Sequence, residues 1–265
     1  MRKITYTNAV NGLSVEFSSE NPLMHLDMKN FDGSSLGADS IAYSPIDFDG
    51  QKIVSTSLNA RTIVLPFEFT AKKNGKFSRS EALKLWENIC NVFVPIHKGM
   101  LVWTDGTRSR QIECRAAETP KITQVLPYMF SASVNLVADF PYWEDTVENK
   151  VVLDVAAAPH YTVTNSCALA VPCYIDISNT DDSLMSFVNA TTGGRFGFGG
   201  ENPSGTFTID SKKCAVILSD GSYGNHYISA NSEYFWLAPG VNKITMVGSA
   251  ATVAIRWRNL YLGVE

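Results

Sequence analysis

The sequence lacks any long apolar run. No segment approaches the roughly 18 consecutive apolar residues that cross a membrane as a helix, and the opening MRKITYTNAV has no apolar stretch of the length that a signal peptide needs. We therefore expect a protein that is made and kept in a cytosol and has no membrane partner.

An excess of basic residues is also missing. The formal net charge is −4 and the pI is about 5.6, whereas proteins that bind nucleic acid usually carry a clustered positive charge that neutralises phosphates. Nucleic acid is therefore not an expected partner.

Cysteine is scarce and unpaired. The chain has five, an odd number, and none falls in a CxxC pair, which argues against a disulfide framework or a zinc site. We expect buried or unreactive thiols at Cys90, Cys114, Cys167, Cys173 and Cys214.

Reactive side chains do not gather in any known pattern. The four histidines (His25, His97, His160 and His226) are scattered, without an HExxH motif or a spacing that predicts a catalytic triad. The sequence thus predicts no catalytic, cofactor-binding or metal-binding residues, no cofactor, and a structural or binding role.

Three short motifs resemble catalytic or ligand-binding sites, but each has a simpler structural explanation. Asp181-Asp182 could be the carboxylate pair of a glycosidase, yet neighbours on a strand face opposite ways, which favours a solvated turn. Asp47-Phe48-Asp49-Gly50 resembles a calcium loop, but Leu58 stands where the bidentate Glu is needed, which favours a hairpin turn. GGRFGFGG (193–200) misses the GxGxxG spacing, and glycines at a strand bend account for it.

What the chain does have is enough apolar residues, 45% of the total, for one large core or two ordinary ones. Before residue 150 there are 16 Lys/Arg and 17 Asp/Glu, and after it 6 and 9. This change of composition predicts two domains, 1–145 and 146–265.

Turn signals predict hairpins in the first domain. Asn11-Gly12 and Asp105-Gly106 each interrupt an alternating stretch and tolerate the positive φ angles of a tight turn. The polar, Gly-rich segment 18–52 is too long for an idle connection and is a candidate contact loop. Pro66 inside TIVLPFEFT indicates an edge position or a bulge.

One helix is predicted after Ser78. Ser78 and Glu81 have the spacing of a capping box, and apolar residues then recur every three or four positions until Pro95. The residues that make up this stripe are Ala82, Leu85, Trp86, Ile89, Val92 and Phe93.

Short strands separated by turn residues fill the second domain and predict a β-sandwich. In SEYFWLAPGVNKIT, Trp236 is either a stacking platform for sugar rings or a packed residue beside the Pro239-Gly240 turn, and alternation places Phe235 and Leu237 together on the other face. We favour turn and packing.

The stretch VAIRWRNL places Trp257 on one strand face and Arg256 and Arg258 on the other. A buried tryptophan with solvated arginines is the simplest interpretation, and a protein contact through the two arginines is the alternative. The sequon Asn189-Ala190-Thr191 has no meaning without secretion.

Taken together, several segments resemble the distal tail proteins (Dit) of siphophages that infect Gram-positive hosts. In the first domain these are the opening hairpin, SPIDFDGQ before LNARTIVLPFEF, SRSEALKLWENICNVF, KGMLVWTDGTRSRQIECRAAETPKI and VADFPYW. In the second they are NATTG, FTIDS and NHYISANSEYFWLAPGVNKIT, in which the WLxPGxN turn is the most distinctive.

The resemblance implies a mainly β, non-enzymatic virion protein with a β-rich N-terminal domain containing one helix and a galectin-like C-terminal β-sandwich. It further implies that the N-terminal domain forms a homohexameric ring at the tail tip, the C-terminal domain being displayed outside it. The implied partners are other copies of the chain, the tail tube protein, the tail-associated (Tal) protein and, in some relatives, receptor-binding proteins. The sugar-site patterns HxNxR and WGxE of galectins are absent.

Two other functions stay open. One is a carbohydrate-binding module at the host surface, with Trp236, Tyr223 or Tyr227 as stacking residues. The other is a wall-degrading enzyme, which no residue spacing predicts.

Overall fold

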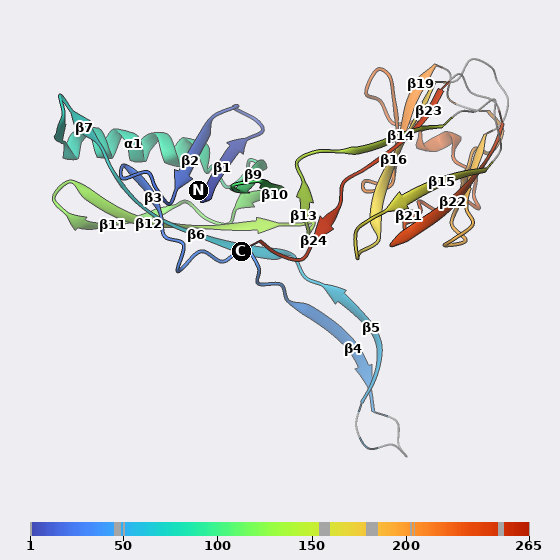
Figure 1. Cartoon of the computed structure of the whole chain (residues 1–265), viewed down its shortest axis with the longest axis horizontal. Coiled ribbons are helices and arrows are strands. Elements are labelled where there is room, and N and C mark those ends of the chain that lie inside the picture. The colour runs from blue at the N-terminus through green and yellow to red at the C-terminus, as the bar shows by residue number, and fades with distance from the viewer. Residues whose placement is uncertain are drawn as a thin grey trace. The chain divides into compact units, whose positions relative to one another are not determined.

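The computed structural model describes residues 2–44, 49, 51–153, 160–178, 185–201, 203, 205–248 and 252–264. Among them the chain is mainly β with one α-helix, which confirms the predicted fold class. The chain divides into two compact units, which Figure 1 shows in ribbon form: unit 1 is 1–146 with 261–265, and unit 2 is 147–260.

Unit 1 differs from the predicted first domain by taking the last residues of the chain as well. Val264 is buried in the core of unit 1, and its carbonyl accepts a hydrogen bond of 2.7 Å from the Ser34 hydroxyl. Nothing in the composition of the C-terminal stretch separates it from unit 2, so the sequence alone could not predict this return.

Unit 1 is built on a ten-stranded sheet that closes on itself. The order is β11-β12-β6-β3-β2-β1-β9-β10-β13-β24, and β10 also pairs with β12, so the strands between them form a barrel. The strands are β1 (Arg2–Asn8), β2 (Ser14–Ser18), β3 (Met24–Leu26), β6 (Arg61–Thr70), β9 (Gly99–Asp105), β10 (Arg108–Ala116), β11 (Lys121–Leu126), β12 (Met129–Ala138), β13 (Trp143–Asp145) and β24 (Leu260–Tyr261).

The hairpins predicted from turn signals are confirmed. β1 and β2 pair around Asn11-Gly12, and β9 and β10 pair around Asp105-Gly106. Gly12 has a φ of 71° and Gly106 a φ of 58°, the left-handed region that glycine enters without strain.

The predicted helix is α1 (Arg79–Val92), and Ser78 is its N-cap, with its hydroxyl accepting from the Glu81 backbone N–H. The helix buries Ala82, Ile89 and Val92 against the strands of unit 1, and β7 (Lys72–Lys73) and β8 (Lys76–Phe77) form a small hairpin just before it. Figure 1 shows the helix lying along the sheet.

The prediction for Pro66 is wrong. β6 lies inside the sheet, and its pairing with β12 runs without a bulge from Met129–Thr70 to Ala138–Arg61. The Pro66 carbonyl accepts from the Asp27 N–H, just beyond the last paired residue of β3, Leu26. A strand residue directs its nitrogen and carbonyl to the same side, so the missing N–H of proline falls where β3 has ended.

Unit 2 contains two sheets. One has the order β14-β23-β16-β19-β20, with β21 attached to β16, and the other has the order β15-β22-β17-β18. The elements are β14 (Asn149–Leu153), β15 (His160–Asn165), β16 (Val171–Ser178), β17 (Ser186–Asn189), β18 (Arg195–Gly197), β19 (Thr206–Asp210), β20 (Ala215–Leu218), η1 (Asn225–Tyr227), β21 (Trp236–Leu237), β22 (Gly240–Val247) and β23 (Thr252–Trp257).

The core of unit 2 comes from alternate residues of both sheets. Ile175 and Ile177 of β16 are buried, as are Phe187 of β17 and Ile244 of β22, while the residues between them are more exposed. A sheet with one buried face needs a second layer, and the two sheets provide it for each other. No helix among the described residues is both long enough and apolar enough to span a membrane.

Candidate interaction surfaces

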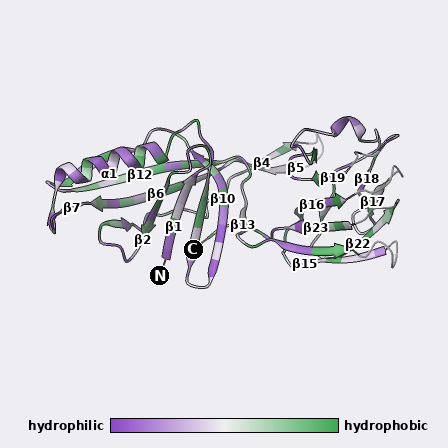
Figure 2. Ribbon diagram, turned by 90° about the horizontal axis from the view of Figure 1, so that it is seen from above, coloured by the Kyte–Doolittle hydropathy of each residue, from purple (hydrophilic) through white to green (hydrophobic). Residues whose placement is uncertain are grey.

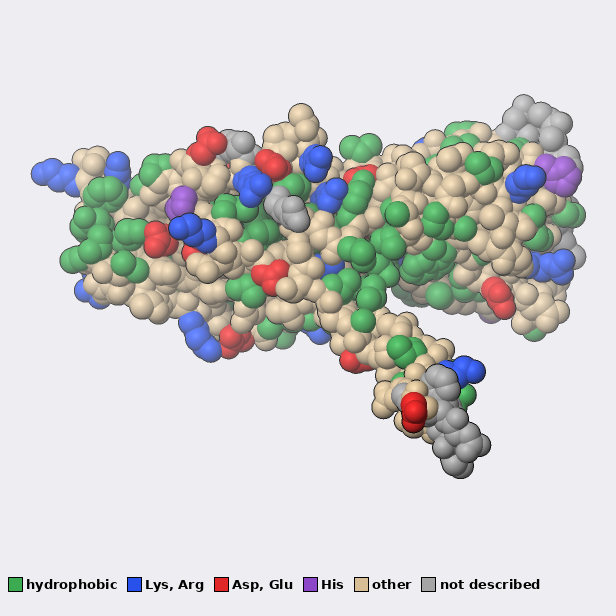
Figure 3. All heavy atoms as spheres, turned by 60° about the horizontal axis from the view of Figure 1, so that its bottom comes forward, with side chains coloured by type: hydrophobic (Ala, Val, Ile, Leu, Met, Phe, Trp, Pro, Cys, Tyr) green, Lys and Arg blue, Asp and Glu red, His purple; other side chains and the backbone are tan. Residues whose placement is uncertain are grey.

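A two-stranded arm stands out in unit 1. β4 (Ala38–Tyr43) and β5 (Lys52–Leu58) pair only with each other, and every residue of both strands is exposed. Figure 1 and Figure 3 show this hairpin extending away from the barrel of unit 1. Its first strand, β4, lies in the segment 18–52 that the sequence predicts to be a contact loop, whereas β5 lies beyond that segment except for Lys52.

The arm exposes large apolar side chains to solvent. The exposed fraction is 69% for Ile41, 62% for Ile53 and 66% for Val54, and Tyr43 and Leu58 are exposed as well. An isolated two-stranded hairpin is at best marginally stable in water, and exposed apolar side chains gathered in one place mark interaction sites. The arm therefore has the properties of a surface that another protein covers.

The root of the arm is held by Arg61, which sequence reasoning missed. This arginine is fully buried and is the first residue of β6, three positions after the end of β5. Its guanidinium donates to the carbonyls of Pro141 at 2.6 Å, Gly33 at 3.0 Å and Ser35 at 3.3 Å, and to that of Leu262. Burial lowers the pKa of Arg61, and the ring of carbonyl acceptors compensates for the lost water. A lone arginine before an apolar strand gives no signal of this role.

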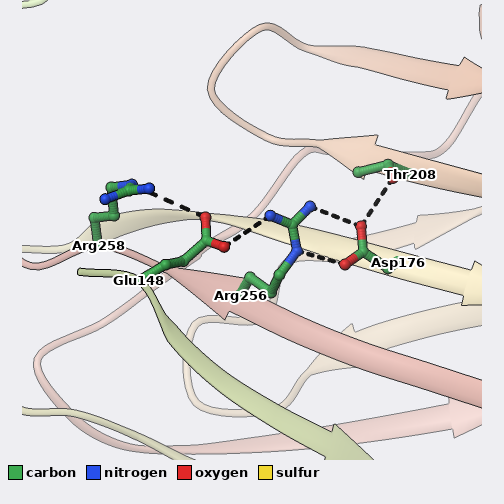
Figure 4. Close-up of polar contacts among 5 residues, drawn as sticks. All are labelled: Glu148, Asp176, Thr208, Arg256 and Arg258. Atoms are coloured by element: carbon green, nitrogen blue, oxygen red, sulfur yellow. Dashed lines mark hydrogen bonds and ion pairs between the residues drawn. The ribbon is translucent and has the colours of Figure 1, made fainter. Parts of the chain in front are cut away.

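A second group of charged residues lies on unit 2 and is drawn in Figure 4. The Arg256 guanidinium makes two hydrogen bonds to the Asp176 carboxylate and one of 2.8 Å to Glu148. The Thr208 hydroxyl donates to Asp176 at 2.8 Å, and Arg258 forms a longer ion pair with Glu148. These residues link neighbouring strands of one sheet.

The interpretation of solvated arginines is therefore wrong. The Arg256 and Arg258 side chains are only 27% and 26% exposed, because the carboxylates of Asp176 on β16 and of Glu148, just before β14, hold them. Burial opposes ionisation of Asp176, but the hydrogen bonds from Arg256 and Thr208 outweigh it and lower the pKa of Asp176. Since these donors are already used, the network is better explained as a support of the sheet than as a contact for another protein.

The turn that follows Trp236 is a packing element. Phe235 and Leu237 are buried while Trp236 is half-buried, which confirms the predicted division of faces. Gly240 has a φ of 83°, as the turn requires. Trp236 lies on β21, whereas Tyr223 is exposed next to β20 and Tyr227 ends η1, so the three proposed stacking residues come from separate elements.

Buried asparagines explain two motifs of the resemblance. Asn242, the last residue of WLxPGxN, donates to the carbonyls of Ala238 and Gly240 and accepts from the Ala238 N–H. Asn189, the first residue of NATTG, donates to the Asn242 side-chain oxygen at 3.0 Å. Both are fully buried, so Asn189 is no acceptor for a glycan.

The remaining candidate residues do not form a site. The histidines lie apart: His25 in β3, His97 beside Asn8, His160 beside Thr245, and His226 tilted against the ring of Tyr227. Within the described ranges, no three His, Cys, Asp or Glu residues lie close enough to hold a metal ion. Asp181-Asp182, and all of 47–50 except Asp49, lie outside the described residues.

The glycine-rich stretch 193–200 is part of the core. β18 runs through it, and Phe196 and Phe198 are both buried in an edge-on contact. A Cβ atom on Gly194 would lie 2.5 Å from that of Phe235, so the absence of a side chain allows close packing. This supports the prediction of glycines at a strand bend.

The thiols are free cysteines in varied surroundings. Cys114 and Cys173 are buried, Cys90 and Cys167 half-buried, and Cys214 exposed. Burial raises the pKa of Cys173 to about 12 and also raises that of Cys114. Of the thiols expected to be buried or unreactive, two are buried; the reactivity of the other three stays a prediction.

One protein family matches part of the chain. Residues 175–261 match the family described as "Siphovirus-type tail component, C-terminal domain". No curated protein matches the chain.

Solved structures share the fold of nearly the whole chain. The crystal structure of the Dit protein of phage SPP1, described as a paradigm of the hub adsorption apparatus in phages that infect Gram-positive hosts, has a TM-score of 0.66 at 11% identity and covers 90% of this chain and 98% of that one. A chain of the phage P2 baseplate in its activated conformation with Ca has a TM-score of 0.61 at 8% identity, with both chains covered in full. A chain of the same baseplate with Sr has a TM-score of 0.59 at 8% identity, again with both chains covered in full.

Residues 175–261 thus resemble the C-terminal domain of a siphovirus-type tail component, and over nearly its whole length the chain has the fold of the solved Dit and baseplate chains.

Proposed function

We propose that this chain is the hub of a siphophage tail tip, where six copies close into a ring through unit 1. The ring joins the tail tube to the baseplate and to the tail-associated protein. Support comes from the solved relatives, which are described as a hub protein and as part of a baseplate. The corresponding place in the virion is the tail tip.

The observation that carries the proposal is the exposed β4–β5 arm. A head-to-tail ring needs two different patches on each subunit, and an arm that leaves the barrel from a root fixed by Arg61 is suited to be one of them. The second patch is a surface of unit 1 on the next copy. Covering the apolar side chains of the arm would supply part of the driving force of assembly.

Unit 2 then makes the contacts of the hub with proteins outside the ring. We propose that its galectin-like sandwich anchors receptor-binding proteins, while the domain boundary near residue 146 separates assembly from display. Sugar binding is the weaker alternative, since Trp236 is half-buried and its backbone carbonyl accepts from Asn189.

The arm gives a direct test. Replacing two of its exposed residues, Ile41→Asp together with Ile53→Asp, introduces two charges that the neighbouring copy would have to bury. We expect the wild type to assemble and this double variant to stay monomeric in light scattering coupled to size exclusion, with unchanged circular dichroism.

A matched control uses equally exposed residues of unit 2. Val152 and Val247 are each 60% exposed, so Val152→Asp with Val247→Asp adds the same charge elsewhere. This control should assemble like the wild type. Equal assembly of the arm variant and the wild type would contradict the proposed role of the arm.

A further inference from the structure

One end of the barrel of unit 1 is lined by arginine where its core ends. Residues directly opposite each other in paired strands share a face, and Arg2 and Arg108 both lie opposite Asp105, from β1 and β10. One step further in, Ile4 and Arg110 lie opposite Trp103. Since Ile4 and Trp103 are core residues, the three arginines occupy inward-facing positions.

The three arginines, Asp105 and Trp103 line a hollow of about 460 Å³, together with Ser34, Leu262 and Gly263. We name this hollow the arginine mouth. Three guanidinium groups face one carboxylate there, so its formal charge is +2 although the whole chain carries −4. Figure 2 shows the hydrophilic colour on the end of β1 beside the N-terminus.

Part of the mouth is already fixed in position. The Arg110 guanidinium lies 3.6 Å from the centre of the Tyr261 ring and donates to the Gly263 carbonyl at 2.8 Å. An arginine held by stacking and by a carbonyl loses little side-chain freedom when a ligand arrives, which favours binding.

One exposed donor of the mouth, and one buried donor of a residue that lines it, have no acceptor. Within the part of the chain that the structure describes, no hydrogen bond or ion pair engages the exposed Arg108 guanidinium. The indole N–H of Trp103 is buried without a partner, although buried polar groups are nearly always hydrogen-bonded. Arg2 holds Asp105 only loosely, at 3.7 Å between exposed side chains.

From these features we infer that the arginine mouth binds a carboxylate-bearing, acidic peptide segment of another protein. Guanidinium forks pair with carboxylates through two parallel hydrogen bonds. Nucleic acid is the less suitable ligand, because its binding needs a long positive tract, and here the positive charge is confined to one hollow of an acidic chain. The inference rests on unit 1 alone and does not require the ring.

The test uses the full chain and a fluorescein-labelled hexaglutamate peptide, with fluorescence anisotropy at low salt. We expect saturable binding that weakens strongly at about 0.5 M salt, where charges are screened within about 4 Å. Arg108→Gln removes an exposed side chain and should lower the affinity about tenfold, the loss expected for one charged hydrogen bond. The matched control is Arg195→Gln, another exposed arginine, on β18, which should leave binding unchanged.

A second variant separates binding from folding. Trp103→Phe keeps an aromatic ring in the core but removes the N–H that has no acceptor, so it should weaken peptide binding without lowering the thermal midpoint. A labelled hexathymidylate of comparable charge and inorganic phosphate serve as the competing anions. The inference is overturned by absent peptide binding, by equal losses in Arg108→Gln and Arg195→Gln, or by tighter binding of the oligonucleotide or of phosphate.

Discussion

The side-chain amide of Asn189 donates a hydrogen bond of 3.0 Å to the side-chain oxygen of Asn242, 53 residues further along the chain. Asn242 also closes the turn after β21 by bonding both polar groups of Ala238. The two most recognisable motifs of unit 2 are therefore halves of one buried polar network. Their spacing is explained by packing and does not depend on a ligand.

Replacing Asn242 with alanine should destabilise unit 2. The change removes the acceptor of the half-buried Ala238 N–H and one of the two acceptors of the buried Asn189 amide, which costs about 1–3 kcal/mol of unfolding free energy. Urea unfolding followed by tryptophan fluorescence measures it. Asn231→Ala, at an exposed asparagine, is the control and should change the free energy of unfolding little. An equal loss of stability in the control would contradict the role of the buried network.

The sequence predicts those parts of the structure that depend on residues close together along the chain, and misses those that depend on residues far apart. The α1 helix with its Ser78 cap and the hairpins at Gly12 and Gly106 depend on neighbouring residues, so local patterns predict them. The return of Val264 to unit 1 depends on contacts across more than 200 residues, and no local pattern encodes them.

The candidate surfaces show the same division. The long polar segment 18–52 predicts a contact region, but its length alone cannot distinguish a loop from the exposed β4–β5 arm. The roles of Arg61, Asp176 and Arg108 depend on which strands become neighbours. A charged residue in a strand looks the same in sequence whether it is solvated, paired or lining a hollow.

The carboxylate of Asp176 makes the stability of unit 2 depend on pH. Its pKa is lowered in the folded state, so its contribution is fully present above the unfolded value of about 3.9 and is lost as the pH falls through the folded pKa. Asp176→Asn should cost about 2 kcal/mol at pH 7. The difference from the wild type should shrink at pH 3.

Thermal or urea unfolding at the two pH values measures this dependence. Glu201→Gln, at an exposed carboxylate, serves as the control and should behave like the wild type at both. If Asp176→Asn lost the same stability at pH 3 as at pH 7, the ionised carboxylate would not be the source of the effect.

The cysteines should react in two groups. Cys214 is exposed, whereas Cys114 and Cys173 are buried and their pKa values are raised, so few thiolates form there at neutral pH. We expect a disulfide reagent such as DTNB to modify Cys214 within minutes and to reach Cys114 and Cys173 only after unfolding. Peptide mapping identifies the modified residues; early labelling of Cys173 would show that the core of unit 2 opens readily.

The central claim is that copies of this chain close into a ring through unit 1. Native mass spectrometry of the purified protein at micromolar concentration, with negative-stain images of the same sample, tests it most directly. The account predicts a species of about six times the 29.1 kDa of one chain and rings of six-fold symmetry. A single species at the mass of one chain, with no rings in the images, would contradict it.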